Sequence, residues 1–406
     1  MSGKHNGVQA RVKAVAPDAV YVHCKAHCLN LAIVHACKIP CVRTLMATVQ
    51  EVGFAFDYSA KRLEAYLDEL SANDDVQAAM DKKTKLQTLC ETRWVSRSDA
   101  LTTFKHAFPV VVHSLENLNQ DSDEKAGLHL AAVSRFEFII ALIVCEHALR
   151  LLVHLSVFLQ DQSCDMLAAL EECKVVIAQL RGERTDDEVW NALFQEAVDL
   201  AQAFDIQPCI PRRAGRQQHR NNAPADTPSE YWKVTLYNVF VDHLLMELEE
   251  RLIVAEPKFK AFNLLPRKVN EFDEEHFNVT FDAYNADIIG DRDDFRAEVQ
   301  RWTLRWNMAA HKPVSVCDTI KCTNRHLYPS VFNVLVALLT IPVSTATAER
   351  SFSCLKRLKT YLRSTMGQTR LQNLAVLHTH SAIDVDVEKI IDIFADKKKR
   401  NLNFVF

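Results

Sequence analysis

The stretch STATAERSFS, residues 344–353, follows a nearly continuous hydrophobic segment and precedes a strongly basic one. The hydrophobic segment, YPSVFNVLVALLTIP (328–342), ends at Pro342 and predicts a core helix that is buried on most sides. Ser344 or Thr345 is expected to cap a second helix. Glu349 then falls in the first turns of that helix, where the dipole favours an anion. The sequence therefore predicts two consecutive helices.

Apolar residues recur at intervals of three or four along the second helix, and they resume after Gly367, which is expected to break it, with Thr369 capping the next one. We expect these residues to form an inward stripe, with the cations on the outer face. Each buried leucine would contribute about 1.5–3 kcal/mol. The sequence leaves open whether the stripe completes one chain or meets a partner chain. It consists of Phe352, Leu355, Leu358, Leu362, Leu371, Leu374 and Leu377.

The composition indicates a globular and mainly helical chain. Its 406 residues are 48% hydrophobic, enough for roughly two or three domains with a real core. It has only eight glycines, and helical spacing of apolar residues runs through most of it. The strand candidates are few, namely AVYVHC (19–24) and KLQTLC (85–90). The expected class is therefore α/β, predominantly helical.

Charge and hydropathy exclude some classes of protein. A net charge of −4 argues against a chain coated in basic residues, although residues 211–220 concentrate arginines locally. The apolar stretch 136–159 contains Glu146 and Arg150, so we interpret it as a buried helix and not as a membrane span. The first residues carry no apolar signal-peptide core, and the cysteines are expected to be reduced thiols of a cytosolic or nuclear protein.

Three ordered blocks resemble one known family. The C-terminal segment from TATAERSFS to VLHTH (345–380), the block VHCKAHCLNLAI (22–33) and the block ETRWVSR (91–97) are similar to signatures of hAT-superfamily transposases. Within that superfamily the chain resembles domesticated proteins of the zinc-finger MYM-type and protein-kinase-inhibitor-repressor kind. The resemblance implies an RNase H-like core interrupted by a large helical insertion. It divides the chain into a partial core (1–108), an insertion with a flexible basic loop at 208–230 (109–325), and C-terminal core helices with the dimerisation region (326–406).

The resemblance also implies a catalytic ancestry for Glu349. In the family this glutamate joins two aspartates that bind divalent metal such as Mg²⁺, which activates water or a DNA 3′-hydroxyl. This chain begins at the segment that follows both aspartates, so they are expected to be absent, and one remaining acid is too few to hold the metal ions. Asp18 is a poor substitute, and Glu349 is otherwise a helix-start anion beside Arg350. The expected chain is not an enzyme and uses no cofactor.

Other residues receive binding roles from the resemblance. Trp94 matches a tryptophan that stacks on a flipped base, although a tryptophan after a short strand is often a core residue. Cys24 and His27 match a pair near the active site; as zinc ligands they are weak candidates, because a tetrahedral site needs four ligands. Cations that would contact phosphates with salt-sensitive affinity are Arg93, Arg350, Arg212, Arg213 and Arg216.

Three functions follow from these features. The first and favoured one is a non-enzymatic, transposase-derived nuclear protein that forms a homodimer or higher oligomer and contacts DNA or a protein partner, with no role for a membrane. The second is a fragment of an active hAT transposase, performing metal-dependent DNA cleavage and strand transfer. The third is a decaying element with no selected role. Metal-dependent cleavage would separate the second from the others.

Overall fold

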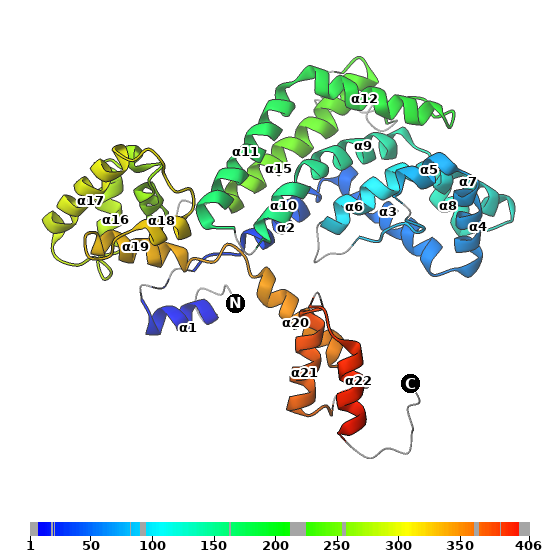
Figure 1. The fold of residues 1–406 in the computed structure, drawn as a ribbon. Helices are drawn as coiled ribbons and strands as arrows, with labels where there is room; N and C mark the ends of the chain where they lie inside the picture. Colours follow the sequence, from blue (N-terminus) through cyan, green and yellow to red (C-terminus); the bar gives the residue numbers. More distant parts are fainter. Residues whose placement is uncertain are drawn as a thin grey trace. The chain divides into compact units, whose positions relative to one another are not determined.

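A computed structural model (Figure 1) divides the chain into two compact units, Met1–Ser344 and Thr345–Phe406. We refer to them as unit 1 and unit 2. The structure describes residues 7–17, 19, 21–81, 83–89, 95–161, 164–211, 225–253, 257–360, 365–381 and 383–397.

The first half of unit 1 is a succession of α-helices, as the spacing of apolar residues predicts. They are α1 (Val8–Val15), α2 (Lys25–Ala36), α3 (Pro40–Asp57), α4 (Ala60–Ser71), α5 (Asp74–Ala79), α6 (Val95–His106), α7 (Phe108–Gln120), α8 (Glu124–Val133), α9 (Phe136–Leu151), α10 (Val153–Leu159), α11 (Met166–Thr185) and α12 (Asp187–Gln202).

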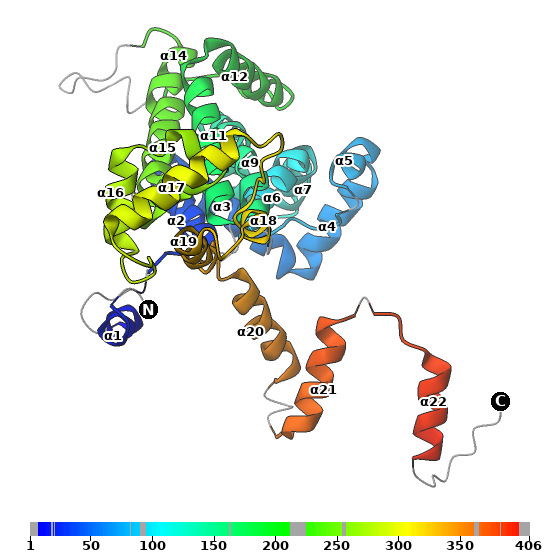
Figure 2. The same cartoon turned by 60° about the vertical axis from the view of Figure 1, so that its left-hand side comes forward.

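The second half of unit 1 mixes α-helices with tighter and wider turns. It consists of α14 (Pro228–Trp232), a π-helix η1 (Lys233–Tyr237), α15 (Asn238–Leu252), the 3₁₀ segments η2 (Pro257–Leu264) and η3 (Val269–Glu271), α16 (Glu274–Ala283), α17 (Arg292–Asn307), α18 (Val316–Cys322) and α19 (Pro329–Leu339). α15 packs on α2 and lies beside α11 (Figures 1 and 2). This packing joins segments more than 200 residues apart in the sequence.

α9 is a central core helix of unit 1. Nearly all its side chains are buried, and it packs against α3, α6 and α12. The predicted single helix over 136–159 is in fact two, because at Leu152 the backbone N–H bonds to the Leu149 carbonyl, closing a tighter turn. By length and composition residues 136–159 could span a membrane, as could α2 and α3 taken together across their 105° bend. However, 72% of the apolar stretch within 136–159 is buried inside the protein.

One buried acid on this apolar helix has hydrogen-bond partners. Glu146 of α9 is 1% exposed, and its two oxygens accept hydrogen bonds from Thr102 Oγ1 at 3.0 Å and Lys105 Nζ at 3.2 Å. Arg150 adds a longer contact at 3.7 Å. Burying an ion is tolerated when partners satisfy it in this way. The charges that argued against a membrane span are therefore explained by α6 packing on α9.

The expected RNase H-like α/β core is not supported. The part of the chain that the structure describes contains no strand: residues 19 and 21–24 are irregular, as are 85–89. A lone extended segment has no partner strand to pair its backbone groups. Leu89 instead donates its N–H to the Gln50 side chain at 2.9 Å. Short β-branched runs predicted strands here, but without a neighbouring strand they remain connections between helices.

The C-terminal part of unit 1 follows the sequence prediction closely. Trp302 and Trp306 share one buried face of α17, with ring centroids 5.4 Å apart. α19 is the predicted core helix, and it buries Val331, Val334, Leu335 and Leu338. Its first turn is capped from α17, because the Glu298 carboxylate accepts the Val331 N–H at 2.8 Å.

The described residues of unit 2 form three short helices, α20 (Ala346–Leu358), α21 (Gln368–Thr379) and α22 (Val387–Asp396). α20 packs against α21. Thr345 is the N-cap residue of α20, as expected. Gly367, not Thr369, is the N-cap residue of α21, since the glycine has extended backbone angles directly before the helix. The expected three-part division of the chain remains a prediction beside this two-unit organisation.

Candidate self-association surface

Glu349 is hydrogen-bonded at the start of α20. Thr345 Oγ1 donates a hydrogen bond to Glu349 Oε1 at 2.7 Å, and the Glu349 N–H donates to the Thr345 carbonyl at 3.0 Å. Glu349 and the neighbouring Arg350 are exposed. The acid thus serves as a helix-start anion, in keeping with its favourable place on the helix dipole.

The apolar stripe of unit 2 is not inward, contrary to the prediction. Phe352 is 70% exposed, Leu355 39% and Leu377 60%, while Leu358, Leu371 and Leu374 are half-buried. Leu362 lies outside the described residues. In the described part of this unit Ala346 is the single buried residue. The predicted helices are present, but two or three short helices supply too little surface to bury each other's apolar side chains.

The exposed apolar surface continues past the predicted seam. Val376 on α21, then Ile383, Val385 and Val387, are each more than two-fifths exposed, and so are residues further along α22. Exposed apolar side chains in this number along consecutive helices point to an interaction site. We call the exposed apolar side chains of α20 and α21 the apolar face; they are Phe352, Leu355, Val376 and Leu377.

Cations lie on the same helices. Arg350, Lys356, Arg357 and the C-cap residue Lys359 are exposed, and Glu349 is the only acid of α20. Lys356 and Arg357 occupy the last turn, where a helix favours positive charge. The predicted outer basic surface is therefore present, and the apolar face and the basic residues are both accessible to a partner.

The metal chemistry implied by the family does not fit the residues that the structure describes. Among them no group of three or more histidine, cysteine, aspartate or glutamate side chains converges as a metal site. Glu349 is exposed and hydrogen-bonded to Thr345. His27 is exposed, whereas Cys24 is half-buried at the N-cap of α2. We derive no metal-dependent step from this arrangement.

Several predicted binding residues stay predictions. Trp94, Arg93 and Asp18 fall outside the part of the chain that the structure describes. The same holds for the arginines of the predicted basic loop, Arg212, Arg213 and Arg216. Within the predicted loop 208–230, residues 208–211 and 225–227 are irregular, and α14 already begins at Pro228.

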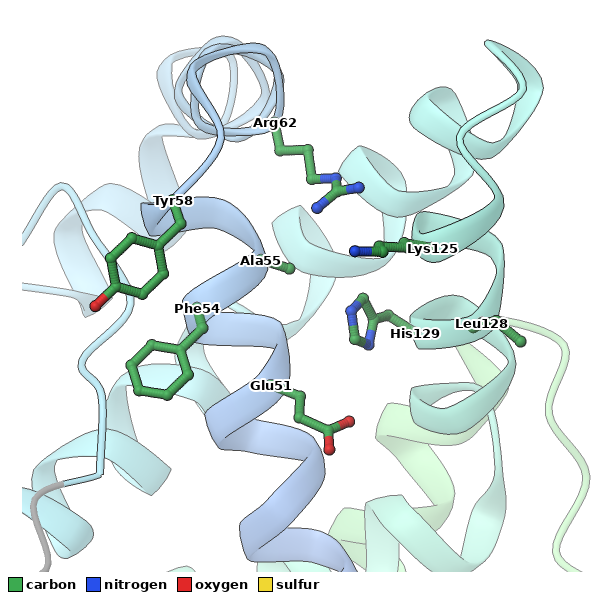
Figure 3. Close-up of a pocket in the computed structure, with 8 residues that line it drawn as sticks. All are labelled: Glu51, Phe54, Ala55, Tyr58, Arg62, Lys125, Leu128 and His129. Atoms are coloured by element: carbon green, nitrogen blue, oxygen red, sulfur yellow. The ribbon is translucent and has the colours of Figure 1, made fainter.

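A cleft that the sequence did not reveal lies between α3, α4 and α8, with a volume of about 510 Å³. Figure 3 shows Lys125 and His129 extending from α8 toward α3, and Glu51 extending from α3 toward them. Burial lowers the pKa of His129 and favours its neutral form. Arg62 is held by the Asp123 carboxylate through bonds of 2.7 and 2.9 Å. Both signs of charge line the cleft, with Glu51 on one side and Lys125 and Arg62 on the other.

Comparison with protein families finds a match near the C-terminus of the chain. Residues 293–383 match the hAT family C-terminal dimerisation region. The match confirms the resemblance drawn from the sequence and defines the class of this segment: it is a dimerisation region of the hAT type. In the structure this region runs from α17 through the apolar face on α20 and α21.

Two curated proteins are similar over almost the whole chain. The 52 kDa repressor of the inhibitor of the protein kinase from Homo sapiens is 27% identical over 410 residues, covering 97% of this chain. The Mus musculus protein of the same name is 26% identical over 413 residues, again covering 97%. The chain spans about half, 53%, of the length of each relative. Together these matches support a transposase-derived protein whose dimerisation region supports self-association.

Proposed function

We propose that this chain acts as a non-enzymatic, transposase-derived protein that forms a homodimer through the apolar face of α20 and α21. One observation carries the proposal: three residues of the expected seam, Phe352, Leu355 and Leu377, lie exposed on the two helices at the end of the hAT dimerisation region. Covering exposed apolar surface is worth about 25 cal/mol per Å². A second copy offers the same face, and a two-fold interface pairs a patch with itself.

The non-enzymatic part of the proposal rests on Glu349 and on the relatives. The glutamate that matches the catalytic acid of the family is bonded to Thr345 at the start of a helix, and the described residues bring no further metal-binding side chains to it. Two similar proteins are named as repressors. We therefore extend to this chain a role in repression, through binding and not through cleavage of DNA.

The predicted DNA-binding arginines suggest what the dimer binds. Arg350 is exposed on α20, and the sequence predicts further phosphate contacts from Arg93, Arg212, Arg213 and Arg216. Two copies would double this charge on one assembly, which favours a polyanion such as DNA in the nucleus. Such binding would weaken steeply with salt, because phosphate contacts release counterions.

The test is a pair of exposed substitutions measured by light scattering and circular dichroism. Leu377→Glu and Phe352→Glu place a carboxylate on the apolar face, and we expect a dimer to become a monomer with unchanged helix content. Leu128 is exposed on α8 in unit 1. The substitution Leu128→Glu is therefore the matched control and should leave the dimer intact. Retention on DNA should fall for the monomeric variants and with rising salt.

Two outcomes would contradict the proposal. A wild-type chain that stays monomeric at high concentration would contradict the proposed dimer. Magnesium-stimulated strand transfer that is lost in Glu349→Gln would show an active transposase instead. Leu374→Glu alone is less informative, because Leu374 is half-buried and the change can unfold unit 2.

A further inference from the structure

α22 lies beyond the matched dimerisation region, which ends at residue 383. We propose that α22 of one chain packs on α20 and α21 of a second copy of the chain, and that the second chain returns the same contact. The inference rests on the proposed dimer and deepens it by naming a third helix and its binding partner.

The first argument is that α22 has an apolar side that stays largely exposed in the described part of the chain. Val387 is 61% exposed, Ile390 49% and Ile393 56%, and no residue of the helix is buried. Its contact with the other helices of the described chain is at most marginal. The helix is properly started, since the Asp386 side chain accepts the Lys389 N–H at 3.0 Å. However, ten residues are too few for a helix to persist alone in water.

The second argument is charge. α22 carries three acids against one lysine, a net charge of −2, and the residues are Glu388, Lys389, Asp392 and Asp396. α20 carries three cations against one acid, a net charge of +2, and α21 adds Arg370. The apolar side of α22 and the apolar face of α20 and α21 therefore come with opposite charges. Complementary charge around an apolar contact fixes which surfaces pair.

The third argument is continuity. Exposed apolar residues run from Val376 and Leu377 on α21, through Ile383 and Val385, to Val387 on α22, and none of the described residues between them is buried. The surface assigned to dimerisation therefore extends into α22. In a two-fold dimer each α22 would meet the other chain once, so one complementary pair of surfaces is used twice.

The experiment uses two charge-reversed forms of the full chain. The first form carries Glu388→Lys and Asp392→Lys on α22; the second carries Lys356→Glu and Arg357→Glu on α20. In either form alone, the two surfaces of a homodimer repel. We expect the dissociation constant of each homodimer to rise roughly tenfold. Mixing the two forms should restore dimers at the wild-type concentration, because every contact in the mixed dimer is again between opposite charges.

The outcomes separate this inference from the proposed dimer. If wild type is a dimer and both reversed forms dimerise unchanged, α22 is not in the interface, while the dimer itself stands. If both forms weaken but mixing restores nothing, α22 packs within its own chain and the exchange is refuted. If wild type is a monomer, that result contradicts the proposed dimer and, with it, the contact of α22 with a second copy. Ile390→Asp provides an independent disruption, and Lys174→Glu, exposed on α11, is the matched control.

Discussion

Two acids of unit 1 cap helices in settings that shift their pKa in opposite directions. Asp123 accepts the N–H groups of Lys125 and Ala126 at the start of α8, and its bond from Arg62 lowers its pKa to about 2. Glu298 caps α19, but burial raises its pKa despite the bond from Val331. A cationic partner in one case and a buried setting in the other thus decide which charge state the same kind of cap prefers.

Asp123 should make folding sensitive to acid. Its pKa in the folded chain lies below the ordinary value near 3.9, so its stabilisation is present above about pH 4–5 and is lost as pH falls toward 2. Arg62→Ala should lower the free energy of unfolding at pH 7 by about 1–3 kcal/mol, since it removes two charge-assisted hydrogen bonds. Urea unfolding of wild type and variant at pH 7 and pH 3 checks this. A gap that does not shrink at pH 3 would contradict it.

At the scale of the element, α9 and α22 are both rich in isoleucine, yet their surroundings differ. α9 is enclosed by α3, α6 and α12, whereas α22 has no buried residue. Since the cost of a shortened side chain depends on the contacts it loses, the same kind of substitution should act differently in the two helices.

Leu142→Ala on α9 should therefore lower the free energy of unfolding by about 2–5 kcal/mol, because Leu142 is fully buried and the change leaves a cavity. Ile390→Ala on α22 should change the stability of unit 1 by no more than about 0.5 kcal/mol. All five tryptophans fall in residues 1–344, so their fluorescence during urea unfolding reports this unit alone. Equal losses in the two variants would show that α22 belongs to the same core.

At the scale of the whole molecule, the chain combines one large unit with a hydrophobic core and one small unit without its own core. Unit 1 contains the continuous cluster of buried side chains from α2 to α19. Unit 2 has too few buried residues to be stable by itself, as expected for a small unit that depends on association.

Removal of residues 345–406 should therefore leave unit 1 folded and convert the dimer to a monomer. Cooperative urea unfolding followed by tryptophan fluorescence should keep its midpoint, while light scattering should report the mass of one chain. Loss of cooperative unfolding would show that unit 1 needs unit 2 for its fold. A dimer that survives would place the interface on α17 to α19, the other part of the matched region.

The sequence by itself determined the helices with strong apolar periodicity, among them α9 and α19, and the family of the C-terminal region. These features depend on residue spacing and local motifs, which the sequence contains in full. Only the tertiary structure decided that residues 19, 21–24 and 85–89 form no sheet, that Phe352 and Leu377 stay exposed, and that α3, α4 and α8 line a cleft. Burial, strand pairing and enclosure depend on neighbours far along the chain or on another chain, and no local pattern records which neighbours are present.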